Sequence, residues 1–269
     1  MNYSSFHKIA PQNVLRGEFA WKEGLGLVKS ICGNPIFLGR SCSTAELRQD
    51  LVRDLIDFGI NPLSLELQYD CCEEDLTRLK QMALKHSSDA VIAAGGGKVL
   101  DSGKLLADRL GVPCITVPLS ASTCAGWTAL SNIYSTSGAY LKDVSLSQCP
   151  ALLVFDHGFV RRAPSRTLAS GIADALAKWY ESSVSSGSSA DGLVQQAVQM
   201  ARVLRDQLLV EGIDALKDPT SDSWVRVAEG CALTAGLIGG IGGPSCRTVA
   251  AHAVHNGLTH LSACHDFLH

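Results

Sequence analysis

Short apolar segments alternate with helical segments through the first half of the chain, and this alternation restricts the possible fold more than any other feature. Residues 89–94 (DAVIAA) form an apolar run typical of a buried strand, and the segment after them has helical spacing. The expected strands are residues 35–39, 59–67, 89–94, 113–118 and 151–155, and the expected helices between them are residues 43–58, 73–86 and 99–110. Strands that alternate with helices build βαβ units, so we expect a mostly parallel, Rossmann-like α/β domain over residues 1–156.

The pattern changes after Asp156. No convincing strand follows, which predicts an all-α second domain over residues 157–269. Its expected helices are residues 166–183, 190–209, 223–237 and 248–258. Within the first domain, residues 131–142 predict a hairpin that turns at Thr136-Ser137-Gly138, and residues 21–32 are the only helical signal near the start.

Charge and composition exclude several classes of function. A net charge of −3 argues against nucleic acid or an anionic membrane as the main partner. No apolar run is long enough to cross a bilayer, and the first ten residues lack the pattern of a secretory signal. We therefore expect a cytoplasmic protein whose 10 cysteines are reduced thiols.

A glycine loop, Gly95-Gly96-Gly97-Lys98, stands between an expected strand and an expected helix. Glycines let a phosphate approach the backbone, and the helix start offers free N–H groups. A P-loop would need Ser or Thr after the lysine, and a G-x-G-x-x-G loop would need glycine in place of Leu100. A tight structural turn therefore remains an alternative. The loop at residues 118–124 leaves the sheet at the same edge, so the two loops together predict a dinucleotide cleft.

Two histidines three residues apart, His252 and His255, lie on one face of an otherwise apolar helix that we expect to be buried. Imidazole is the commonest metal ligand, and it also occurs in cores as a hydrogen-bonded side chain. The helix alone leaves these two interpretations equal.

Four stretches in order are similar to one known family: GGGKVLDSGK at 95–104, SASTCAGWTALSNIY at 120–134, GIADALAKWYE at 171–181 and AAHAVHNGLT at 250–259. They resemble the glycerol dehydrogenase branch of the iron-containing (group III) alcohol dehydrogenases. Their residues are most similar to the motifs of the hydroxycarboxylate dehydrogenases, which reduce 2-oxo acids. The resemblance implies a dehydroquinate synthase-like architecture, a homo-oligomer, and an enzyme that transfers a hydride between NAD(P)(H) and an alcohol or 2-hydroxy acid.

The resemblance also implies a single catalytic metal. Its ligands would be Asp174, His252 and His269. Iron-type relatives have a further histidine four residues after the aspartate, where this chain has Lys178, so we expect zinc rather than iron. His255 is then a candidate proton relay, with a hydrogen bond beside the metal ligand as the alternative.

Cofactor residues follow from the same motifs. The resemblance assigns the phosphates and the adenosine half to the two loops, and the nicotinamide half to Thr128, Leu130 and Tyr134, matched through the A-L-S-N-I-Y motif. The expected cofactor residues are Arg40, Gly95, Gly96, Gly97, Lys98, Val99, Asp101, Leu119, Ser120, Ala121, Ser122, Thr128, Leu130 and Tyr134. Many NAD-dependent relatives have an acidic residue after the first strand, but this chain has Arg40, which suits a 2′-phosphate and favours NADP(H).

Two departures from the family bear on activity. Cys124 replaces the aspartate that contacts the polyol in glycerol dehydrogenases, which favours an anionic 2-oxo or 2-hydroxy acid as substrate. Relatives also continue well beyond the third ligand, so the chain is expected to be C-terminally short. One alternative is glycerol dehydrogenase itself. Another is a glycerol-1-phosphate dehydrogenase or a dehydroquinate-synthase-like lyase, but the phosphate-binding basic residues that these would need are not evident around Cys124. The last alternative is a truncated, inactive dinucleotide-binding protein.

Overall fold

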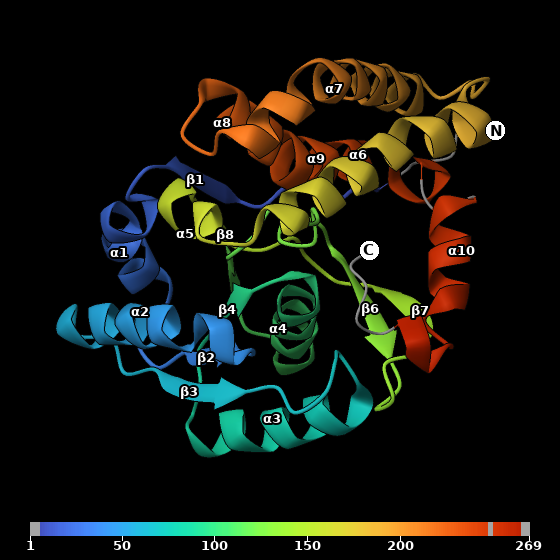
Figure 1. The fold of residues 1–269 in the computed structure, drawn as a ribbon. Coiled ribbons are helices and arrows are strands. Elements are labelled where there is room, and N and C mark those ends of the chain that lie inside the picture. The colour runs from blue at the N-terminus through green and yellow to red at the C-terminus, as the bar shows by residue number, and fades with distance from the viewer. Residues whose placement is uncertain (1–5, 247–249, 265–269) are drawn as a thin grey trace.

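A parallel sheet forms the centre of the first half of the molecule (Figure 1). The structure is a computed structural model, and it describes residues 6–246 and 250–264. The sheet has the strand order β1-β8-β5-β4-β2-β3, and each neighbouring pair is parallel. The strands are β1 (Asn13–Gly17), β2 (Ile36–Gly39), β3 (Leu63–Glu66), β4 (Val91–Gly95), β5 (Cys114–Pro118) and β8 (Leu152–Asp156). The expected parallel α/β domain is confirmed.

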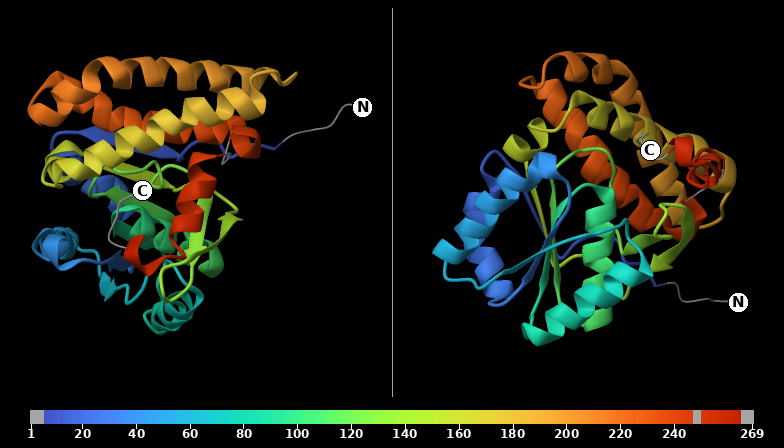
Figure 2. Two further views of the ribbon diagram at one scale, coloured as in Figure 1. Left: turned by 45° about the vertical axis from the view of Figure 1, so that its right-hand side comes forward. Right: turned by 60° about the horizontal axis from the view of Figure 1, so that its bottom comes forward.

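Helices cover both faces of this sheet (Figure 2). They are α1 (Ala20–Ile31) and α2 (Ala45–Asp57) on one face, with α3 (Glu73–Lys85) and α4 (Gly97–Leu110) on the other. β4 shows why: Val91 and Ala93 belong to the core under α3 and α4, whereas Ile92 and Ala94 belong to the core under α1 and α2. Successive side chains of a strand point to opposite faces, so a strand covered on both sides has to be apolar throughout.

The carboxyl ends of β2 and β4 form a topological switch point. The chain leaves β2 toward β3 on one side, and it leaves β4 toward β5 on the other. Ligands of open α/β sheets bind in the crevice at such a point. The predicted hairpin closes one side of it: β6 (Leu130–Tyr134) and β7 (Tyr140–Ser145) pair antiparallel as a separate two-stranded sheet.

Helices follow β8, as expected. They are α5 (His157–Arg161), α6 (Ser165–Ser186), α7 (Gly192–Lys217), α8 (Asp222–Glu229), α9 (Ala235–Gly242) and α10 (Ala251–Leu258). A π-helical turn at Gly230–Thr234 joins α8 to α9. The expectation that no stretch is long enough to cross a membrane is corrected here, because the joined segment Asp222–Gly242 is long and apolar enough by length and composition. In the structure 56% of its most apolar window is buried, with Val227 and Ile238 in the core that α6 and α7 share.

The structure differs from the sequence-based expectations in two places. β1 was not expected, because Asn13–Gly17 has no apolar run and most of its side chains are exposed. It exists because its backbone pairs with β8 at the edge of the sheet. The prediction that α10 is buried is wrong: none of its residues is buried, and Val254 is 63% exposed. Only the side of α10 that carries the histidines faces the rest of the described molecule.

Candidate functional site

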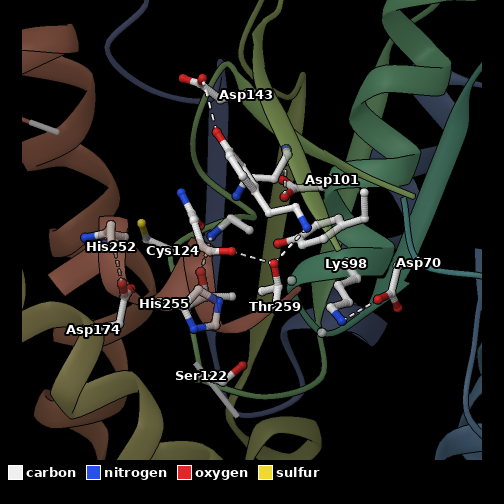
Figure 3. Close-up of a pocket in the computed structure, with 18 of the residues that line it drawn as sticks. Asp70, Lys98, Asp101, Ser122, Cys124, Asp143, Asp174, His252, His255 and Thr259 are labelled. Atoms are coloured by element: carbon white, nitrogen blue, oxygen red, sulfur yellow. Dashed lines mark hydrogen bonds and ion pairs between the residues drawn. The ribbon is translucent and has the colours of Figure 1, made fainter. Parts of the chain in front are cut away.

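A cleft of about 910 Å³ opens at the carboxyl edge of the sheet. Its walls come from the loops after β2, β3 and β5, the start of α4, the β6–β7 hairpin, and α6 and α10. Figure 3 shows side chains from both halves of the chain converging on this space. Ligand pockets have volumes of roughly 300–1,000 Å³, so the cleft is large enough for a cofactor.

The glycine loop forms one wall. Gly96 and Gly97 line the cleft, and α4 begins at Gly97. The first N–H groups of a helix have no acceptor within the helix and carry a partial positive charge. A Cβ atom on Gly96 would project into the cleft wall with Ser120 Oγ, 3.9 Å away, as its nearest neighbour. The missing side chain therefore leaves room beside free N–H donors, which suits a phosphate group.

A carboxylate holds two basic side chains next to this loop. Asp70 lies in the loop after β3 and is buried. It forms ion pairs with Arg40, which follows β2, and with Lys98 at 2.5 Å (Figure 3). The ammonium of Lys98 also lies 5.1 Å from the centre of the Tyr134 ring. Arg40 and Lys98 are thus fixed at the cleft by Asp70, a residue for which the sequence offered no motif.

Asp101 and Lys104 form a buried ion pair, with 3.1 Å between Lys104 Nζ and Asp101 Oδ1. Lys104 also donates to the backbone carbonyls of Thr128 and Leu130, and the Asp101 carboxylate accepts from the backbone N–H of Asn132. Burial raises the pKa of Asp101, and the Lys104 charge opposes that rise. Asp101 lines the cleft, whereas Lys104 attaches the start of β6 to α4.

The remaining predicted cofactor residues divide into two groups. Those that line the cleft, besides the ones already described, are Val99, Ser120, Ser122, Thr128 and Leu130. Three others, Gly95, Leu119 and Ala121, are buried behind the wall. Leu119 donates its backbone N–H to the carbonyl of Gly95 at 3.0 Å, so these residues join the two loops and do not face the cleft.

Asp174 and His252 meet at the cleft, away from Lys98 (Figure 3). They come from α6 and α10, and His252 Nε2 lies 3.2 Å from Asp174 Oδ1. Ligand atoms that share a tetrahedral zinc ion lie about 3.4 Å apart, because each is about 2.1 Å from the metal. Within residues 6–246 and 250–264, no third His, Cys, Asp or Glu completes a three-ligand group. His269, the expected third ligand, lies outside the described residues.

His255 lines the same cleft from the next turn of α10. Burial lowers the pKa of its imidazole below the ordinary 6.5, and the nearby His252 and Lys98 lower it further. The ring is therefore neutral near pH 7, the state in which it can accept a proton.

Cys124 also lines the cleft and is largely buried. Burial raises the pKa of its thiol, and Asp174 acts in the same direction, whereas Lys178 lowers the pKa. The side chain is thus a neutral thiol with a lysine close by. The fold brings Lys178, one turn after Asp174 on α6, into the same cleft, a neighbour of Cys124 that was not identified from the sequence.

A residue that sequence reasoning missed lies behind His252. Both carboxylate oxygens of Glu181 contact His252, one its backbone N–H at 3.0 Å and the other its Nδ1 at 2.5 Å. Glu181 follows Asp174 by seven residues, or about two helical turns, so both lie on one face of α6. This spacing was the only signal in the sequence.

The chain is similar to known oxidoreductases. The family model described as iron-containing alcohol dehydrogenase matches residues 11–157. An uncharacterised oxidoreductase of Synechocystis sp. is 46% identical over 263 residues, which cover 97% of this chain and 67% of that protein. A glycerol dehydrogenase of Pseudomonas putida and hydroxycarboxylate dehydrogenase A of Escherichia coli are 38% and 37% identical, each over 74% of this chain and 56% of the relative. The chain thus spans between about half and two thirds of the length of these relatives.

The fold is similar to that of solved structures. A probable glycerol dehydrogenase from Sinorhizobium meliloti superposes with a TM-score of 0.86, covering 98% of this chain and 74% of that one. The two sequences are 24% identical. At this identity the likeness shows the architecture, with a parallel α/β part followed by helices, and says nothing of the substrate.

Proposed function

Because the chain belongs to the iron-containing alcohol dehydrogenase family, we propose that it is a metal-dependent oxidoreductase that uses NAD(P)(H) and acts on an alcohol or 2-hydroxy acid and its carbonyl form. The observation that carries this proposal is the meeting of Asp174 and His252 in the same cleft as the glycine loop. A hydride transfer assisted by a metal needs a phosphate-binding wall and a metal-binding wall that face one space.

The cofactor would lie along the α/β side of the cleft. Gly96, Gly97 and the first N–H groups of α4 would bind its pyrophosphate. Thr128, Leu130 and Tyr134 would contact the nicotinamide half, which supplies or takes up the hydride. Arg40 at the end of β2 favours NADP(H), and a kcat/KM with NAD(H) far above that with NADP(H) would contradict this preference.

A divalent metal would be held by Asp174 and His252, with His269 as third ligand on the strength of the family resemblance. When bound there, the metal would polarise the substrate oxygen and lower the pKa of an alcohol. Lys178 occupies the position of the fourth, histidine ligand expected in iron-type relatives, so zinc is the proposed metal. His255, neutral near pH 7, is the proposed group that takes up the proton of the substrate hydroxyl.

The substrate class follows from Cys124 and Lys178. A neutral thiol and a lysine leave this part of the cleft more favourable to a carboxylate than an aspartate would. We therefore propose 2-oxo and 2-hydroxy acids as substrates, in keeping with the E. coli relative named hydroxycarboxylate dehydrogenase A. Glycerol is the second candidate, because the P. putida relative is named glycerol dehydrogenase. Binding of a phosphorylated glycerol would need further basic side chains for the phosphate, besides Lys178 near Cys124.

Further parts of the proposal concern the whole protein. We propose domain limits of 1–156 and 157–269, a homo-oligomer and a cytoplasmic location. All 10 cysteines are unpaired thiols in the structure, as a reducing compartment would maintain them.

The deciding experiment combines metal analysis with a substrate panel. The purified chain is analysed for zinc and iron, and oxidation of NADPH and NADH is followed with a series of 2-oxo acids, dihydroxyacetone and dihydroxyacetone phosphate. Stoichiometric metal with fastest turnover of a 2-oxo acid is the expected result. Fastest turnover of dihydroxyacetone would favour glycerol dehydrogenase, and bound metal without any turnover would favour an inactive dinucleotide-binding protein.

A further inference from the structure

Among the described residues, Glu181 is an acidic group beside the proposed metal ligands that has no role in the cofactor, metal and substrate assignments. Its side chain is 5% exposed, and it lies on the face of α6 that carries Asp174. A buried carboxylate costs free energy unless it is hydrogen-bonded, so its partners indicate what it does.

Both of its oxygens contact one residue. Oε1 accepts a hydrogen bond from the backbone N–H of His252, and Oε2 contacts the Nδ1 atom of the same residue. The N–H lies in the first turn of α10, where no residue of the helix accepts it and Ala250 at the N-cap offers no side-chain acceptor. Glu181 therefore fixes both the start of α10 and the imidazole that this turn carries.

The contact at Nδ1 decides which ring nitrogen carries the proton. An ionised carboxylate only accepts hydrogen bonds, so the Nδ1 atom of His252 has to be the donor. The other nitrogen, Nε2, then faces Asp174 Oδ1 at 3.2 Å. With the proton held on Nδ1, a metal bound between Nε2 and Asp174 would take up the Nε2 lone pair in place of this carboxylate contact.

We propose that Glu181 is a positioning residue that fixes the ring orientation and the protonated nitrogen of His252, so that Nε2 and Asp174 face one metal ion. This role rests on the proposed metal site. We assign Glu181 to His252 and not to the ion, because each of its oxygens contacts His252 and it forms no three-ligand group with other described residues. Partners of this kind typically contribute 10- to 100-fold to metal affinity.

Metal titrations of three variants test the role. Glu181→Gln keeps the length of the side chain and an oxygen for the backbone N–H but loses the charge. Glu181→Asp keeps the charge but is one methylene too short. Glu211→Gln is the matched control, since Glu211 pairs with Arg226 at a partly exposed position on α7, away from the cleft. The affinity of the metal-free chain for Zn²⁺ is measured by competition with a chromophoric chelator. We expect a roughly 10- to 100-fold loss in both Glu181 variants and none in the control.

A second readout separates positioning from support of the fold. In the zinc-loaded wild type, long-range ¹H–¹⁵N spectra of His252 will show a protonated Nδ1 and a metal-bound Nε2. A metal-bound Nδ1 would overturn the proposal, as would equal zinc affinity of wild type and Glu181→Gln. These results would leave the proposed function intact. A wild type that binds no divalent metal would overturn the proposed metal site and this role with it.

Discussion

A methyl group at position 171 is expected to push α6 away from the α/β part of the molecule. Gly171 lies where α6 crosses the loop after β5, and a Cβ atom there would come within 1.9 Å of the Ala121 carbonyl oxygen. The clash is with backbone, so no rotamer change can relieve it. An ordinary contact begins near 3.4 Å, so the two segments must separate by about 1.5 Å.

The cost of this separation is partly offset. Overpacking costs typically 1–3 kcal/mol, and a clash with backbone lies at the upper end of that range, at about 3 kcal/mol. Alanine in place of glycine within a helix recovers about 1 kcal/mol. We therefore expect Gly171→Ala to lower the free energy of unfolding by about 2 kcal/mol. Asp174 is three residues further along α6, so the shift should also move it relative to His252 and weaken zinc binding.

Urea unfolding and zinc titration of Gly171→Ala measure both effects. Gly26→Ala is the matched control, because Gly26 lies within α1 and a Cβ atom there has no neighbour within 4 Å. This control should gain roughly 0.5–1 kcal/mol. If Gly171→Ala proved as stable as Gly26→Ala and bound zinc as tightly as wild type, the close approach of α6 to the loop would be refuted.

Three further predictions concern the cleft. Lys104→Met leaves the buried Asp101 carboxylate without its ion pair and should cost about 3–5 kcal/mol in urea unfolding, most of it recovered by adding Asp101→Asn. The free energy of unfolding that Lys104→Met loses should be smaller at pH 5 than at pH 8. Burial raises the pKa of Asp101 in the folded state, so at the lower pH its carboxylate is protonated more readily and no unpaired charge stays buried. Cys124→Asp should raise glycerol oxidation relative to 2-hydroxy acid oxidation, and an unchanged ratio of the two kcat/KM values would contradict the role given to this position. The lowered pKa of His255 means that the unfolded chain binds its proton first as the pH falls. The free energy of unfolding of the wild type therefore decreases as the pH falls below about 6.5. Urea unfolding of His255→Asn should show a smaller decrease between about pH 7 and 5 than the wild type does.

Most of the sheet was predictable because its strands are covered on both faces. Burial on both sides requires an uninterrupted apolar run, as in β4 and β8, and such runs are visible in the sequence. β1 escaped prediction because an edge strand is held by backbone hydrogen bonds, which leave no mark on its side chains. The expected burial of α10 was wrong for a related reason. Apolar side chains allow a helix to be buried, but they do not determine whether another element covers it.

The sequence by itself determined the α/β fold, the glycine loop and, through its resemblance to a family, the pairing of Asp174 with His252 as candidate ligands. Local periodicity and motif order carry that information, since both depend on near neighbours in the chain. Only the tertiary structure decided which groups surround these residues. Glu181 reaches His252 across 71 residues, Asp70 links Arg40 to Lys98, and Lys178 comes to lie near Cys124. Contacts of this kind depend on how α6, α10 and the sheet edge meet, and no local pattern of residues encodes that arrangement.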